Sequence, residues 1–124
     1  MNADAGKLKA ERQARYRRGH VSEYLAAALL IAKGYRILAR RFQSPGGEVD
    51  LVACRGKRLA FIEVKRRPTL EACETSIGNA QRQRIRRAAE CWLARHSRHR
   101  QYDICFDAIF LAPGKWPRHL PNSI

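Results

Sequence analysis

Acidic residues are few in this 124-residue sequence, which has 11 Asp and Glu against 25 Lys and Arg. The resulting net charge of +14 and the pI near 10.7 are typical of a protein that binds a polyanion. Nucleic acid is the simplest such partner, and an acidic membrane surface is the alternative.

Long apolar runs are also lacking. The longest, Leu25 to Ala32, is far shorter than the roughly 18 residues that a membrane-spanning helix needs. The basic N-terminus is not followed by an apolar region with a small-residue cleavage site, so we expect no signal peptide. These absences predict a cytoplasmic protein without a membrane partner.

Cysteines with metal-binding or redox spacing are absent from the sequence. The four cysteines form no C-x-x-C pair, and none has the spacing to histidine that is typical of a zinc site. Cys54, Cys91 and Cys105 fall inside expected helices or strands, which favours small buried thiols. This usage favours a reducing compartment.

The length of the chain suits one domain with a single core. Helical spacing of apolar residues runs from Gly19 to about Lys33, and three short strands follow between Tyr35 and Arg67. A helical turn is expected near Leu70–Cys73, and a long helix from about Ala80 to His96 with Asn79 as its N-cap. The expected core face of the first helix consists of Val21, Tyr24, Leu25, Ala28, Leu29 and Ala32.

A fourth strand is expected at Tyr102–Leu111, and its position after a long helix predicts a parallel crossover. The order αβββαβ predicts a three-layer α/β core in which helices flank a four-stranded mixed sheet. We expect a basic, flexible arm over residues 1–14, one domain over 15–112 and an irregular tail over 113–124. In that tail, Trp116, Arg118 and His119 either anchor the chain or contact a partner.

The stretch from Gly47 to Arg67 predicts a β-hairpin whose two-residue loop is Gly56-Lys57, because a type II′ turn prefers Gly first. With that loop, Arg55 faces Arg58, and counting inwards places Asp50 opposite Glu63. The same count places Glu48 opposite Lys65. Period two then puts all four of these inner residues on one face.

Opposed side chains on an antiparallel pair have Cβ atoms roughly 4.5–5.5 Å apart, so the carboxylates of Asp50 and Glu63 repel unless a proton or cation lies between them. One interpretation is therefore a site for a divalent cation with oxygen ligands. The alternative is a solvated, mixed-charge strand face, against which the apolar neighbours Leu51, Phe61 and Ile62 argue.

Two further polar residues face the expected sheet. Glu23 shares a helical stripe with Ala27 and Leu30, so it is either a partly buried carboxylate or an ordinary first-turn Glu near the helix dipole. Gln81 continues the apolar stripe of the second long helix backwards and should point along the sheet. The arginines of that helix are either a solvated surface or phosphate contacts.

This order of elements, with Glu63-Val64-Lys65 following Asp50 after twelve intervening residues, resembles the PD-(D/E)xK nuclease superfamily. That superfamily has the restriction-endonuclease-like fold and includes archaeal Holliday-junction resolvases. The chain is more similar still to the small bacterial YraN-like family of predicted endonucleases, over roughly residues 15 to 112. The matching segments are Gly19-x₃-Glu23, residues 34–38, 47–51, 61–65 and 81–84, and Phe106-Asp107.

Two positions depart from the family pattern. Gln81 stands where many members have Lys, although related resolvases also use Gln there. Cys105 stands where Arg commonly precedes the Phe-Asp pair, which weakens any role for a basic residue at that position.

The resemblance implies that Asp50, Glu63 and the backbone carbonyl of Val64 bind Mg²⁺ or Mn²⁺, with Glu48 as a further candidate ligand or a residue that tunes Lys65. It implies that Lys65 orients or helps to deprotonate water, or stabilises negative charge on the phosphate. It also places Glu23 at the border of the site and Gln81 against the scissile strand. The expected nucleic-acid contacts are Arg17, Arg18, Arg66, Arg67, Arg82, Arg84, Arg86 and Arg87.

The leading hypothesis is a metal-dependent endonuclease that acts on DNA, including branched or recombining DNA. A catalytically silent nucleic-acid-binding protein with the same fold is the alternative, and an RNA- or ribosome-associated protein is a third reading based on charge alone. A resolvase that cuts symmetrically would need a homodimer.

Overall fold

The computed structural model describes the backbone of residues 2–124 and the side chains of residues 6–10 and 20–124. The side chains of Arg17 and Arg18 therefore lie outside the described residues. The elements, in chain order, are α1 (Asn2–Ala32), β1 (Arg36–Ser44), β2 (Gly47–Arg55), β3 (Arg58–Arg66), α2 (Leu70–Thr75), α3 (Asn79–Arg95), a 3₁₀ turn η1 (Ser97–His99), β4 (Asp103–Leu111) and β5 (Arg118–Leu120).

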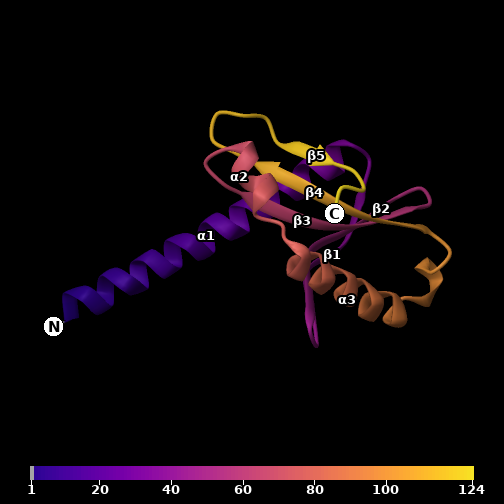
Figure 1. Ribbon diagram of the computed structural model, residues 1–124, viewed down its shortest axis with the longest axis horizontal. Helices are drawn as coiled ribbons and strands as arrows, with labels where there is room; N and C mark the ends of the chain where they lie inside the picture. Colours follow the sequence, from indigo (N-terminus) through magenta and orange to yellow (C-terminus); the bar gives the residue numbers. More distant parts are fainter. Residues whose placement is uncertain (1) are drawn as a thin grey trace.

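The strands of residues 2–124 form one mixed sheet of five strands in the order β1-β2-β3-β4-β5 (Figure 1). Only the β3–β4 pair is parallel, so the predicted crossover is confirmed. The expected count of four strands was wrong, because β5 pairs antiparallel with the end of β4. Its three residues lie between Pro117 and Pro121, too short a segment to show a strand pattern in the sequence.

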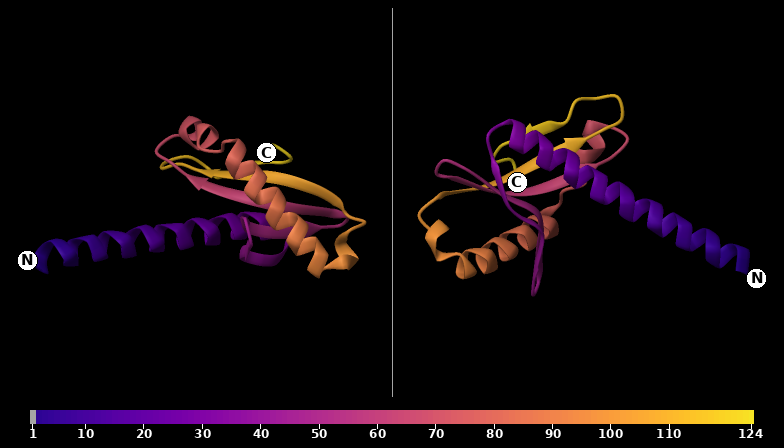
Figure 2. Two further views of the ribbon diagram at one scale, coloured as in Figure 1. Left: turned by 60° about the horizontal axis from the view of Figure 1, so that its bottom comes forward. Right: turned by 180° about the vertical axis from the view of Figure 1, so that it is seen from behind.

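Helices cover both faces of the sheet (Figure 2). The core on the α1 side gathers Ala26 and Leu30 with inward residues of β2, β3 and β4. The core on the α3 side gathers the predicted stripe Ile85, Ala88, Ala89 and Trp92. A smaller cluster beneath α2 contains Cys73 and Ile77. The expected three-layer arrangement of helices around a mixed sheet is therefore present.

Most of the expected core face of α1 was wrong, because only Leu29 of its six residues packs against the core. Val21, Tyr24 and Leu25 are 48%, 58% and 49% exposed, whereas Ala26 and Leu30 are fully buried. The last two turns of α1 are apolar on every side, so periodicity alone could not select the inward stripe. The helix is also longer than expected: its N-terminal part projects from the sheet, and the predicted flexibility of residues 1–14 stays a prediction (Figure 1).

Three smaller expectations were corrected by local structure. Asn79 is the first residue of α3 and Gly78 is its N-cap, which makes no side-chain hydrogen bond. The buried thiol is Cys73, while Cys54, Cys91 and Cys105 are only partly buried. All four thiols are free in the described part of the chain.

The β2–β3 hairpin has the predicted register, with Arg55 paired to Arg58. Gly56 has φ +58°, as the first loop position of a type II′ turn requires. Within residues 2–124, no helix combines the length and apolar character needed to cross a membrane.

Candidate functional site

The site begins where the β2–β3 ladder ends. The last backbone pair before the strands separate is Leu51 with Ile62. One residue further on, the Asp50 carboxylate accepts a hydrogen bond from the backbone N–H of Val64, with Oδ2 and N 2.8 Å apart. The Asp50 side chain thus takes the place of a strand partner and is held in the opening between the strands.

Asp50 and Glu63 are close enough to interact directly, as the hairpin register predicted. Burial, and then the charge of Asp50, raise the pKa of Glu63 to about 8. Burial also raises the pKa of Asp50, and the Val64 N–H and Lys65 oppose that rise. The two carboxylates therefore carry more negative charge than this environment readily accommodates, and a proton or a cation would relieve it.

Two neighbours bracket Glu63. The Lys65 Nζ lies 3.4 Å from Glu63 Oε1, and the Gln81 side-chain amide donates a hydrogen bond to the same oxygen at 3.1 Å. Gln81 reaches the site from the first turn of α3, so its predicted direction along the sheet is confirmed. One carboxylate thus links the lysine of β3 to the helix on the α3 side of the sheet.

Glu23 lies at the side of the site that is nearest α1. It is 9% exposed and sits far from the helix N-terminus, so it is a partly buried carboxylate and not a first-turn residue. Its two oxygens accept from Arg41 Nε at 2.6 and 2.7 Å. Arg41 has φ +51°, a conformation that is uncommon for a residue with a side chain.

Arg41 could not be singled out from the sequence, because it is one of several arginines in β1 and no sequence pattern shows its backbone conformation. The ladder between β1 and β2 pairs Arg40 with Leu51 and Phe42 with Val49, which leaves Arg41 beside Asp50. Arg41 therefore connects the α1 carboxylate to the strand that carries Asp50.

Glu48 does not face Lys65, contrary to the register count. Because the β2–β3 ladder ends at Leu51, the start of β2 follows β1 instead, where Glu48 pairs with Gln43. The Glu48 carboxylate forms an exposed ion pair with Arg84, 3.1 Å away. It lines a separate shallow cavity that also contains Glu23, Arg41 and Asp50.

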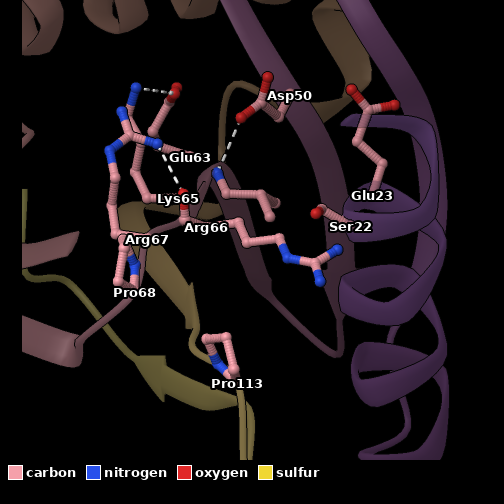
Figure 3. A pocket seen from close by; sticks show the side chains of 10 residues that line it. Ser22, Glu23, Asp50, Glu63, Lys65, Arg66, Arg67, Pro68 and Pro113 are labelled. Atoms are coloured by element: carbon pink, nitrogen blue, oxygen red, sulfur yellow. Dashed lines mark hydrogen bonds and ion pairs between the residues drawn. The ribbon is translucent and has the colours of Figure 1, made fainter. Parts of the chain in front are cut away.

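A pocket of about 650 Å³ opens between α1 and the ends of β2 and β3. Figure 3 shows Asp50 between Glu23 on α1 and the adjacent side chains of Glu63 and Lys65. Arg66, Arg67 and Pro68 continue the wall, and Pro113 enters from the loop after β4. The volume is in the range of pockets that bind small molecules, and Lys65, Arg66 and Arg67 give its wall positive charge.

The α3 arginines are spread over several surfaces and do not line this pocket. Arg82 lines another cavity beneath α2, and Arg84 pairs with Glu48. The Arg86 guanidinium stacks on Phe106, 4.6 Å from the ring centre, and Arg87 lies beside Gly46. Of the expected nucleic-acid contacts with described side chains, only Arg66 and Arg67 reach the pocket.

Asp50 and Glu63 are the side chains suited to hold a cation. Among the described residues, no three His, Cys, Asp or Glu side chains form a ready-made metal site. A cation here would take two carboxylates and complete its shell with water and a backbone oxygen such as that of Val64. This set fits Mg²⁺, which usually keeps several waters and binds through one or two carboxylates.

A second polar cluster surrounds Asp107, which is fully buried. Its carboxylate accepts two hydrogen bonds from Arg58, at 2.7 and 2.8 Å, one from the Asn122 backbone N–H and a contact from His119 Nε2 at 2.8 Å. Burial would raise the pKa of Asp107, but these partners outweigh it and lower that pKa to about 2. The cluster joins β3, β4 and β5 outside the pocket, so His119 is the anchor of the tail.

Comparison with known proteins places the chain in a family. The model of the uncharacterised protein family UPF0102 matches residues 22–111. A UPF0102 protein of Methylorubrum extorquens (strain PA1) is 50% identical over 121 residues, which cover 98% of this chain and 92% of the relative. A UPF0102 protein of Methylobacterium nodulans is 51% identical over 90% and 87% of the two chains, and UPF0102 protein mlr4633 of Mesorhizobium japonicum is 44% identical over 96% and 95%. The chain belongs to the UPF0102 family.

Proposed function

We propose that the Asp50–Glu63 pocket hydrolyses phosphodiester bonds of a nucleic acid, most simply DNA, with Mg²⁺ or Mn²⁺ as cofactor. The observation that carries the proposal is the meeting of a buried carboxylate, a partly buried carboxylate and a lysine in one pocket at the point where two strands separate. A protein that only binds nucleic acid gains nothing from buried carboxylates next to a phosphate site, because they repel the phosphate.

The fold supports the same proposal. A mixed sheet with a β-hairpin, a parallel fourth strand and a helix on each face agrees with the core of the PD-(D/E)xK superfamily. Within that proposal the chain is a nuclease of the YraN-like type, and Asp50, Glu63 and Lys65 occupy the three positions of the superfamily motif.

Each side chain of the site has a part in the proposed chemistry. When bound by Asp50 and Glu63, the metal ion would withdraw charge from the scissile phosphate and lower the pKa of a bound water. Lys65 orients the attacking water and stabilises the negative charge that grows on the phosphate oxygens. The Val64 N–H fixes the Asp50 carboxylate, and Gln81 fixes that of Glu63.

The outer residues position the substrate. Arg66 and Arg67 supply positive charge to the wall of the pocket, which would attract a phosphate backbone (Figure 3). Glu23, which is paired with Arg41, lines the pocket on the α1 side. The site therefore combines a metal-binding carboxylate pair with positively charged side chains in the same pocket.

The test is a cleavage assay with flap, fork, four-way-junction, linear and single-stranded DNA, in Mg²⁺, in Mn²⁺ and in EDTA. We expect metal-dependent cleavage that Asp50→Asn, Glu63→Gln and Lys65→Met each reduce about 10²-fold or more. Asp103→Asn removes an exposed carboxylate from β4 and serves as the matched control, with unchanged cleavage. Binding of these substrates without metal-dependent cleavage of any of them would overturn the proposal and indicate a binding module.

A further inference from the structure

Trp116 is the most exposed large apolar side chain of the described residues. It is 90% exposed, whereas Trp92, the only other tryptophan of the sequence, is 2% exposed in the α3-side core. Tryptophan is highly buried on average in folded proteins, because its indole is the largest apolar side chain. A fully presented indole is therefore a surface that a partner can cover.

The loop that carries Trp116 is held firmly at both ends. Leu111 O accepts a hydrogen bond from Arg67 N at 3.2 Å on one side, and His119 is bound to Asp107 on the other. Between them, Lys115 N donates to Ala112 O, and Pro113 and Pro117 restrict the backbone. An aromatic ring on such a loop loses little conformational entropy when it binds.

The loop also lies beside the proposed active site. Because β3 and β4 are parallel, their C-terminal ends meet at one edge of the sheet, where the β4–β5 loop is seen next to the connection from β3 to α2 (Figure 1). Pro113 lines the pocket with Asp50 and Glu63, and Trp116 follows three residues later. Three residues span at most about 11 Å, so the indole stands within a few nucleotide steps of the pocket wall.

The surroundings of the indole are basic. Lys115 and Arg118 flank it in the chain, and Arg66 and Arg67 line the adjacent pocket. A positive surface that follows the phosphate backbone, together with an aromatic ring on which a base stacks, is the combination by which proteins bind single-stranded nucleic acid.

We propose that Trp116 is a stacking platform for an unpaired nucleobase of the nucleic acid that enters the pocket. This inference rests on the proposed function. It narrows the substrate of the proposed nuclease to strands with unpaired bases near the scissile phosphate. Bases inside a duplex have both faces covered by their neighbours, so they cannot stack on the indole. Trp116 is a specificity residue and takes no part in the chemistry.

Binding in EDTA tests the proposal without any cleavage. Single-stranded oligo(dT) and a blunt duplex of two annealed complementary strands, which has no unpaired base, are titrated into the wild type, Trp116→Ala and Trp116→Phe, and tryptophan fluorescence and anisotropy of labelled DNA are recorded. We expect oligo(dT) to quench wild-type fluorescence. Trp116→Ala should bind oligo(dT) about 5- to 100-fold more weakly and bind the duplex as the wild type does. Trp116→Phe should recover part of the loss, because it keeps an aromatic face.

Two controls separate stacking from charge and from a general loss of aromatic surface. Tyr24→Ala removes another exposed aromatic ring, on α1, where the Arg40 guanidinium lies 4.9 Å from the ring centre, and should leave both affinities unchanged. The slope of log affinity against log salt should be the same for Trp116→Ala and the wild type, because stacking releases no counterions. Unchanged oligo(dT) binding by Trp116→Ala, or equal weakening for oligo(dT) and the duplex, would overturn the inference.

The outcomes for the two proposals are distinct. Quenching by oligo(dT) that is lost in Trp116→Ala, without metal-dependent cleavage of any DNA, would leave the stacking subsite standing and reject the nuclease. Cleavage of single-stranded DNA that is retained in full by Trp116→Ala, with unchanged binding, would reject the subsite alone.

Discussion

Asp50 has a structural task in addition to the proposed metal binding, because its carboxylate is the acceptor for the Val64 N–H. Asp50→Asn keeps an oxygen acceptor and removes a charge that burial opposes, so we expect it to be at least as stable as the wild type. Asp50→Ala leaves the N–H unpaired and should be less stable than Asp50→Asn by about 1–3 kcal/mol. Urea unfolding of the two variants measures the difference, and equal midpoints would contradict it. Asp50→Asn is thus the cleaner variant for assays of activity.

Glu63 should exchange its proton for a metal ion near neutral pH, because its pKa is raised to about 8 in the metal-free protein. The contribution of Glu63 to the free energy of unfolding is therefore complete at low pH and is lost as the pH rises through about 8, because its pKa is higher in the folded than in the unfolded chain. Mg²⁺ binds the deprotonated carboxylate, so its binding should release protons at pH 7, and its affinity should rise by up to about tenfold per pH unit towards pH 8. Calorimetry in two buffers of different ionisation enthalpy measures the release. Glu63→Gln should abolish it, and buffer-independent heats for the wild type would refute the exchange.

At the residue scale, the sequence predicted the centre of the site and Glu23 at its border, but neither the position of Glu48 nor the pairing of Glu23 with Arg41. The Gly56-Lys57 turn fixes the hairpin register, and the register brings Asp50 to Glu63 without any knowledge of the fold. Glu48 was misplaced because the register count assumed that β2 and β3 stay paired to their ends. The start of β2 pairs with β1 alone, and the hairpin sequence does not show where the β2–β3 pairing stops. The Arg41–Glu23 pair depends on a left-handed backbone that no sequence pattern shows.

At the element scale, Gly47 sets the distance between β2 and α3. A Cβ at this position would lie 2.6 Å from Ala88 N and Arg84 O, both backbone atoms of α3. Gly47→Ala should push the helix outward at a cost of about 1–3 kcal/mol and loosen the contact of Gln81 with Glu63. Thermal unfolding measures the cost. Gly6→Ala, where no described atom lies within 4 Å of the added carbon, is the control and should not destabilise the protein.

The Asp107 cluster makes the joint between β3, β4 and β5 sensitive to acid. The pKa of Asp107 is lowered to about 2 from an unfolded value of 3.8, so its contribution is complete above pH 4 and is lost as the pH falls towards 2. Asp107→Asn should cost about 3–5 kcal/mol at pH 7, because it leaves Arg58 without its charge partner, and the difference from the wild type should shrink at low pH. Denaturant unfolding across this pH range measures both effects. A constant difference from pH 7 to pH 2 would show that the charge of Asp107 is not the cause, and Asp103→Asn on the same strand should change nothing.

Helices and strands in which apolar residues recur on a single face could be predicted from the sequence, and the others could not. The inward stripe of α3 alternates with arginines, so only one face was available for the core. The last turns of α1 are apolar on several faces. Packing against the sheet determines that Ala26 and Leu30 face inward, and the sequence of the helix alone does not show it. The strand β5 is too short to show an alternation of apolar and polar residues. It is held by its pairing with β4 and by the hydrogen bond of His119 to Asp107, which lies twelve residues earlier in the sequence.

At the scale of the whole molecule, positive charge is broadly distributed, but only Arg66 and Arg67 of the described arginines line the pocket. Nucleic-acid affinity should fall linearly on a log–log plot against salt, and Arg67→Ala should reduce that slope by about 1. Arg98→Ala, in η1 after the C-terminal end of α3, removes the same charge from a residue that does not line the pocket. Anisotropy titrations over a range of salt concentrations measure both slopes. Equal effects of the two substitutions would mean that net charge, and not the pocket rim, binds the backbone.

The parallel pairing of β3 with β4 has a consequence for synthesis on the ribosome. The β1–β2–β3 meander can form as soon as it emerges, but the strand that covers the other edge of β3 is made only after α2 and α3. At roughly 5–20 residues per second, that edge waits for several seconds with its backbone groups unpaired. An uncovered apolar edge invites association with other nascent chains. Arg58, Lys65 and Arg66 place like charges at the two ends of β3, and we expect these charges to oppose the pairing of nascent copies until β4 is made.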